Sequence, residues 1–267
     1  MALSPETSSA PIELQQAAAY SCDLEHQNRA WQQLQASLSP EQLAAFAQAF
    51  RNGPPATQGG GSKTPAAAKP TAQAPAPAQP TSGNRILLPV PYLCQNDSAT
   101  AQGPRMCFSS SCAMAAAFLR PGCLAGTGQL DDQYLQRVQR HGDTTDAQAQ
   151  VQTLRNLGIE AELRTDGRIE QLIAQLKLGI PVPVGWLHKG PVTAPSGGGH
   201  WSLVIGWEPA QRQLLIHDPN GEADLVGGGY VSTAIGSGKS QRYSERNWGR
   251  RWMVEGPGSG WWLELGC

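Results

Sequence analysis

The sequence predicts an α+β fold with a mainly antiparallel sheet in the C-terminal two thirds of the chain. Two observations support this fold class. Segments with apolar residues at helical spacing occupy the middle of the chain, and glycines follow several of them at C-cap positions. Strand-like apolar runs then come one after another toward the C-terminus, and helices first with consecutive strands later indicate an antiparallel sheet.

The first part of the chain, residues 1–51, is predicted to be a small helical segment. Ser39 and the proline after it form a helix start, and beyond them Leu43, Phe46 and Phe50 recur at helical spacing. A segment of about forty residues makes only a marginal core by itself. Two interpretations stay open: helices that dock an unknown partner protein, or a simple helical appendage.

Residues 52–84 are predicted to form a disordered linker. Pro, Ala and Gly dominate this stretch, Lys63 and Lys69 are its only charges, and it has no aromatic or large aliphatic residue. Such a segment cannot bury enough apolar surface to offset the entropy lost on ordering. The remainder, residues 85–267, is predicted to be one mixed domain.

Four helices are predicted in the mixed domain. The first, Cys107–Leu119, is small and apolar nearly all round, which is typical of a buried helix. The others are predicted at Asp131–His141, Asp146–Leu157 and Arg168–Leu178. The predicted strands are Val182–Leu187, Trp201–Trp207, Gln213–Asp218, Arg251–Glu255 and Trp261–Leu265. Four tryptophans near the C-terminus are interpreted as core residues or as an aromatic shelf for sugars or peptides: Trp248, Trp252, Trp261 and Trp262.

Composition excludes several classes of protein. The net charge is −1 and 15% of residues are charged, so no broad basic surface for nucleic acid is expected. The longest apolar run is shorter than the roughly 18 residues that a membrane span needs. The N-terminus has neither the basic start nor the apolar run of a signal peptide, and six cysteines are too sparse for a disulfide scaffold. We therefore expect synthesis in the cytoplasm with free thiols.

Cys107 is the candidate nucleophile. It opens the predicted buried helix, where unpaired N–H groups and the helix dipole favour a thiolate. Cys112, five residues further on, is interpreted as a small buried hydrophobe instead.

His200 and Asp218 are the candidate base and its orienting group. His200 follows three glycines and begins a predicted strand, and Asp218 ends the next one. Antiparallel pairing of these strands places the Asp218 carboxylate beside His200, where it fixes the imidazole tautomer. His217 is expected to point to the other face of the sheet, because side chains alternate along a strand.

Gln95 is the candidate oxyanion donor, twelve positions before Cys107. Its amide and the Cys107 backbone N–H would together stabilise the oxygen of a tetrahedral intermediate. Each of these residues alone is weak evidence for a catalytic site. Together, in the order Gln, Cys, His, Asp and with Cys107 at a helix start, they are strong evidence.

These segments resemble the C-39-like cysteine peptidases, a papain-like family that includes bacteriocin-processing domains. The resemblance rests on Val-Pro-Tyr before Gln95, on the sequence around Cys107, on Gly-Gly before His200 and on Pro after Asp218. It implies a papain-like fold, with Cys107 as nucleophile, His200 as base and acid, Asp218 as orienting group and Gln95 as oxyanion donor. It implies no cofactor.

Two departures from the family pattern concern substrate preference. Phe108 and Ser109 stand where the family usually has Gly-Pro, and the stretch between Gln95 and Cys107 is longer. Zinc binding by the cysteines and histidines is disfavoured, because no Cys pair has the spacing of a structural site. His188, a rival for the role of base, is expected on a surface turn.

Three functions are weighed. The first is a peptidase or amidase that cleaves peptide or isopeptide bonds in peptidoglycan, of the phage or bacterial lysis type, associated with a virion or released at lysis. The second is a peptidase that processes leader peptides after a double glycine. The third is a catalytically idle binding module of the same fold, against which the complete set of Gln95, Cys107, His200 and Asp218 argues.

Overall fold

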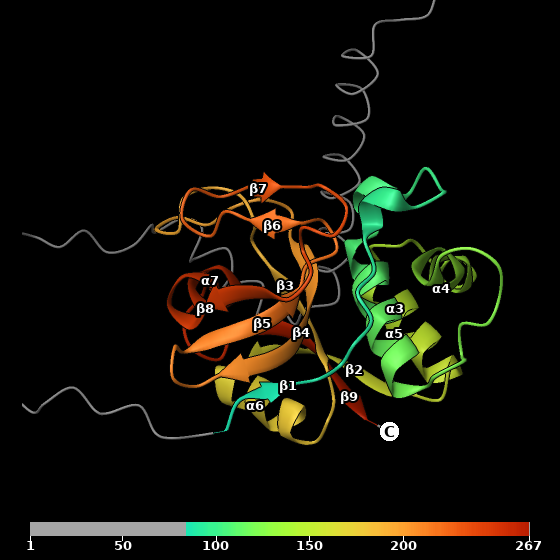
Figure 1. Cartoon of the computed structure of the whole chain (residues 1–267), viewed down its shortest axis with the longest axis horizontal. Coiled ribbons are helices and arrows are strands. Elements are labelled where there is room, and N and C mark those ends of the chain that lie inside the picture. Colours follow the sequence, from blue (N-terminus) through green and yellow to red (C-terminus); the bar gives the residue numbers. More distant parts are fainter. Residues whose placement is uncertain (1–83, 267) are drawn as a thin grey trace, which may run out of the picture.

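A computed structural model of the chain describes residues 84–266. The predicted helical segment 1–51 and nearly all of the predicted linker therefore lie outside the described residues. Within the described part, helices cover both faces of one antiparallel sheet (Figure 1). This arrangement confirms the predicted α+β class.

The main sheet of the described part has seven strands in the order β2-β9-β3-β4-β5-β8, and β1 pairs with β4 beside this path. All of its strand pairs are antiparallel. Its strands are β1 (Ile86–Leu87), β2 (Glu160–Gly167), β3 (Val182–Trp186), β4 (His200–Glu208), β5 (Gln213–His217), β8 (Gln241–Ser244) and β9 (Gly260–Gly266). A separate two-stranded sheet consists of β6 (Glu222–Ala223) and β7 (Tyr230–Ser232).

The helices divide between the two faces of the sheet (Figure 1). Helices α3, α4 and α5 pack on one face, and α6 and α7 pack on the other. Two short 3-10 helices, η1 and η2, precede α3. Their bounds are η1 (Gln95–Asp97), η2 (Gly103–Arg105), α3 (Cys107–Leu119), α4 (Leu130–Val138), α5 (Ala147–Asn156), α6 (Ile169–Lys177) and α7 (Glu245–Trp252).

Side chains that alternate along strand β4 contribute to two hydrophobic cores, one on each face of the sheet. Leu203 and Ile205 face the core beneath α3, whereas Val204 faces the core beneath α6 and α7. Both faces of the strand are buried, which explains its continuous apolar run.

Helix α3 has the predicted bounds and is buried over most of its length. Two of its serines are paired with polar groups: Ser109 contacts the hydroxyl of Thr144, which precedes α5, at 2.8 Å, and Ser110 donates to Asp131 of α4 at 2.7 Å. These pairs allow hydroxyl groups inside a core, because a buried polar group without a partner is costly. Hydrogen bonds from Ser109 and Ser110 to neighbouring elements therefore hold the first turn of α3 in place.

The predicted strand Arg251–Glu255 is wrong, because α7 runs through its first two residues. The Ser244 side chain accepts from the Asn247 N–H and caps this helix. Trp248 and Trp252, one turn apart, stack inside the core with ring centroids 5.1 Å apart. Of the two interpretations made from the sequence, core residues or an aromatic shelf, these two tryptophans follow the first, because helical spacing puts both on one buried face.

Arg251 is fully buried and joins two loops. Its guanidinium donates to the carbonyls of Leu187, Lys189, Gly190 and Leu225 at 2.8–3.1 Å. Burial of the charge lowers its pKa, opposed by Asp224. The β3–β4 hairpin and the loop before β7 are thus tied to one side chain.

No helix within residues 84–266 has the length and apolarity needed to cross a membrane.

Candidate active site

The four candidate residues come from four elements of the fold. Cys107 is the first residue of α3, His200 is the first residue of β4, and Asp218 directly follows β5. Strands β4 and β5 pair antiparallel, so the start of one lies beside the end of the other. Gln95 begins η1 and reaches the same end of the sheet, because its N–H donates to the Pro219 carbonyl at 2.9 Å.

His200 and Asp218 form a buried hydrogen bond. His200 Nε2 lies 2.8 Å from Asp218 Oδ1, and the two residues are 4% and 0% exposed. An ionised carboxylate only accepts, so Nε2 carries the proton of this bond. Nδ1 is therefore the ring nitrogen left for the Cys107 thiol.

Asp218 is held by several donors besides His200. The Asn220 N–H donates to Oδ1 at 3.0 Å, and the Tyr243 hydroxyl donates to Oδ2 at 3.3 Å. The Tyr92 hydroxyl donates to the Asp218 backbone carbonyl at 3.1 Å. The Asp218 N–H donates to the carbonyl of Gly238, where a Cβ would lie 1.8 Å from the Asp218 carbonyl oxygen. Only glycine fits at position 238.

The electrostatics of the site favour a protonated His200. Burial acts to lower its pKa, but the charges of Asp218 and Cys107, with hydrogen bonds to both, outweigh burial and raise the pKa to about 10. A cationic imidazole beside a sulfur stabilises the thiolate form of that sulfur.

Cys107 differs from the other described cysteines. It is only half-buried and stands at a helix N-terminus, whereas Cys94 and Cys112 are buried. Burial raises the pKa of the Cys112 thiol well above its usual range, and burial also raises that of Cys123. Among the cysteines within residues 84–266, Cys107 is the one that is accessible to solvent, stands at a helix N-terminus and has an imidazole beside it.

Gln95 is 2% exposed and tied at both its backbone and its side chain. Its amide Nε2 donates to the Gly103 carbonyl at 2.9 Å, which leaves the second amide proton free to donate elsewhere. Its Oε1 is buried without a hydrogen-bond partner among the described residues. The stretch before Cys107 therefore folds back to orient this amide through Gly103.

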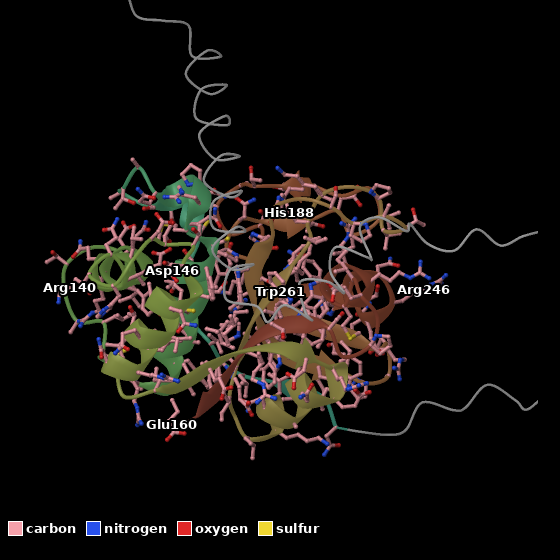
Figure 2. All side chains as sticks on the ribbon, turned by 180° about the vertical axis from the view of Figure 1, so that it is seen from behind. Arg140, Asp146, Glu160, His188, Arg246 and Trp261 are labelled. Carbon is pink, nitrogen blue, oxygen red and sulfur yellow. The ribbon has the colours of Figure 1, made fainter. Side chains whose placement is uncertain are left out.

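His188 does not lie on a surface turn as expected. It is half-buried with its ring centroid 5.6 Å from that of His200, at the end of the domain that carries β6 and β7 (Figure 2). Burial, and then the charges of His200, Lys189 and Arg251, lower its pKa to about 3. His188 therefore stays neutral beside a protonated His200.

Sequence reasoning also missed two aromatic neighbours of His200. Trp186 and Tyr230 meet its ring edge to face, with centroids 5.4 and 5.7 Å away. Trp186 is the register partner of His200 in the β3–β4 pair, so a hairpin register drawn from the sequence could have found it. Tyr230 comes from β7, and no local pattern connects it to β4.

His217 faces away from Asp218, across the sheet. Its Nε2 lies 3.1 Å from the Val90 carbonyl, and its Nδ1 accepts from the Ser240 N–H at 3.0 Å. Burial lowers its pKa to about 4, although the bond to Val90 opposes this. Both ring nitrogens are therefore engaged, and His217 cannot ligate a metal together with His200.

Comparison with known proteins gives a family and several distant structures. The model of the Peptidase_C39 like family matches residues 87–230. A double glycine motif protease from an AMS/PCAT transporter, solved with its leader peptide, is 16% identical, with coverage of 68% of this chain and 98% of that one and a TM-score of 0.39. The peptidase domain of Streptococcus ComA, a bifunctional ABC transporter, is 18% identical, with coverage of 61% and 92% and a TM-score of 0.39.

A C39-like peptidase from Bacillus anthracis is 15% identical, with coverage of 69% of this chain and 98% of that one and a TM-score of 0.41. The search of curated proteins found no match.

Proposed function

The chain belongs to the Peptidase_C39 like family, and from this premise we propose that it hydrolyses peptide or isopeptide bonds with Cys107 as the nucleophile. The observation that carries the proposal is the buried 2.8 Å bond between His200 and Asp218, with the pKa of His200 raised by its two neighbours. Thiol catalysis needs a nucleophile, a base within hydrogen-bond reach of it, and a group that orients the base.

In the proposed reaction the Cys107 thiolate attacks the carbonyl carbon of the scissile bond. The oxygen of the tetrahedral intermediate accepts from the free amide proton of Gln95 and from the Cys107 N–H. His200 then gives its proton to the leaving amine, and a thioester remains on Cys107. Water attacks the thioester while His200 takes up a proton, and the acid product leaves. Asp218 holds the imidazole in one tautomer throughout.

Peptidoglycan cross-bridges are the first substrates we propose, as expected from a peptidase predicted to be tethered to a small helical segment. Double-glycine leader peptides are the second candidate, and one observation favours them. Val226, Val231 and Ile235 are 60–68% exposed on the segment that surrounds β7, whose Tyr230 touches His200. Exposed apolar side chains on this segment suit a peptide that itself carries apolar side chains.

Alkylation with iodoacetamide, read by mass spectrometry, tests the nucleophile. Cys107 should react at least tenfold faster than Cys94 or Cys112, and the Cys107→Ala variant should lose this fast phase. Fastest labelling at Cys112 or Cys94 would overturn the assignment.

A cell-wall zymogram and cleavage of a double-glycine leader peptide then separate the two substrate classes. Cys107→Ala is the control for both assays. Fast alkylation of Cys107 without cleavage of either substrate would favour the binding module.

A further inference from the structure

The two residues that directly follow Cys107 and His200 are in contact with each other. Phe108 and Trp201 stack face to face, with ring centroids 3.5 Å apart and an interplanar angle of 5°. Phe108 is 1% exposed, and Trp201 is half-buried. A contact this close leaves no room for the rings to approach further, so it fixes a minimum separation between α3 and β4.

The other face of the indole is supported by the sheet. Gly185 is the register partner of Trp201, and a Cβ at Gly185 would lie 2.9 Å from the indole ring. Glycine thus lets the indole lie flat on β3, and Phe108 covers it from α3. The stack fills the space between helix and sheet at the site.

Neither ring belongs to a loose segment. Ser109 and Ser110, which follow Phe108, are hydrogen-bonded to Thr144 and Asp131. Trp201 lies in β4, which pairs with β3 on one side and, further along, with β5 on the other. A displacement of either ring is therefore passed on to Cys107 or His200, one peptide unit away.

We propose that Phe108 and Trp201 act as an aromatic spacer that sets the distance and orientation between Cys107 and His200. Both are positioning residues, since they act through their neighbours. This inference rests on the proposed function. It also gives a role to Phe108, one of the departures from the family pattern.

The ratio of the Cys107 alkylation rates at pH 6 and pH 9 tests the spacer. At pH 9 an ordinary thiol is largely ionised, so that rate reports access to the sulfur. At pH 6 the rate reports the thiolate that His200 stabilises, which requires correct spacing. Phe108→Leu and Trp201→Leu should each lower the ratio by about tenfold, because small displacements of reacting groups cost this much or more.

Two variants control for packing and stability. Trp201→Phe keeps a flat ring and should change the ratio by less than about threefold. Phe118→Leu removes a ring from the partly buried far end of α3 and should leave the ratio unchanged even where melting temperature falls. The spacer is overturned if both leucine variants at the stack keep the parent ratio, or if Phe118→Leu lowers it equally. Slow labelling of Cys107 in the parent protein would instead refute the proposed function.

Discussion

Asp218 and Asp131 are two buried carboxylates, one beside His200 and the other beside Ser110 in the first turn of α3, and their surroundings differ sharply. They are 0% and 1% exposed. The Asp218 carboxylate accepts from His200, the Asn220 N–H and the Tyr243 hydroxyl. The Asp131 carboxylate accepts from the Ser110 hydroxyl, and its Oδ1 has no partner among the described residues.

The two carboxyls differ in the number of donors that each one meets, and Asp131 meets few. Burial raises the pKa of Asp131 to about 6; the bond from Ser110 opposes this, and the charges of Asp132 and Asp97 add to it. Asp218 has a cationic imidazole and two further donors instead. We infer that Asp218 orients His200 in the proposed reaction, and that Asp131 fixes the first turn of α3 through Ser110.

The largest expected effect comes from Asp218→Asn, which keeps the shape of the side chain but changes what it offers to His200. We expect kcat/KM to fall by about 10³–10⁴, as when the wrong imidazole tautomer is favoured in a catalytic triad. Steady-state kinetics on a cleaved peptide, with melting temperature as a folding control, measures the loss. Retention of more than a tenth of the parent activity would contradict the role of Asp218.

The same variant should shift the alkaline limit of activity. His200 must be protonated to give a proton to the leaving amine, and with a pKa of about 10 activity should fall only as the pH rises through that value. Loss of the Asp218 charge removes a leading cause of the raised pKa, so the limit should move to lower pH in Asp218→Asn. The pH profile of kcat/KM from pH 6 to 10.5 tests this, and an unmoved alkaline limb would refute it.

A smaller effect, on stability, is expected from Asp131→Asn. The pKa of Asp131 is about 6 in the folded protein and 3.8 ordinarily, so between these values the folded protein binds a proton that the unfolded chain has released. Stability therefore falls as pH rises through this window, by up to about 3 kcal/mol. Asparagine stays neutral, so the free energy of unfolding of the variant should rise relative to that of the parent between pH 4 and pH 7.

Urea unfolding at pH 4, 5.5 and 7 measures that gain. Ser110→Ala sharpens the test, because it removes the donor that lowers the pKa of Asp131 and should move the pH-dependent fall to higher pH. Parallel curves for the parent and Asp131→Asn would mean that Asp131 carries no raised pKa.

Tyr243→Phe should give the smallest effect, because Asp218 keeps its bonds to His200 and Asn220. We expect kcat/KM to fall about three- to tenfold, the range for one lost hydrogen bond. Some stability is lost as well, since the Ala223 N–H donates to the same hydroxyl at 3.0 Å. A loss as large as that of Asp218→Asn would mean that Tyr243 does more than support the carboxylate.

Elements with an internal signal could be predicted from the sequence, and contacts between distant segments could not. Helix α3 is apolar all round and β4 is a long apolar run, and both were predicted near their actual bounds. Strand β2 was missed because it carries several charged residues and, among the strands within residues 84–266, pairs with β9 alone at the edge of the sheet. Strand β9 itself, predicted at Trp261–Leu265, was confirmed.

For the site, the sequence supplied the candidates and their order, whereas the supporting contacts needed the fold. Nothing near Gln95 in the sequence indicates that its amide is oriented by Gly103, or that Tyr230 meets His200. The prediction that His188 lies on the surface was wrong for the same reason. A histidine between turn residues is expected to be exposed, and only the fold shows which segments cover it.

The binding of four carbonyls by Arg251 also bears on the genetics of this protein. One side chain holds together the loop between β3 and β4, which ends at His200, and the loop that leads to β7. Lysine cannot reproduce a planar fork of donors, so even that replacement should leave some carbonyls without a partner. A screen for temperature-sensitive alleles should accordingly recover substitutions at codon 251, active in the cold and inactive when warm, although this arginine is not one of the proposed catalytic residues.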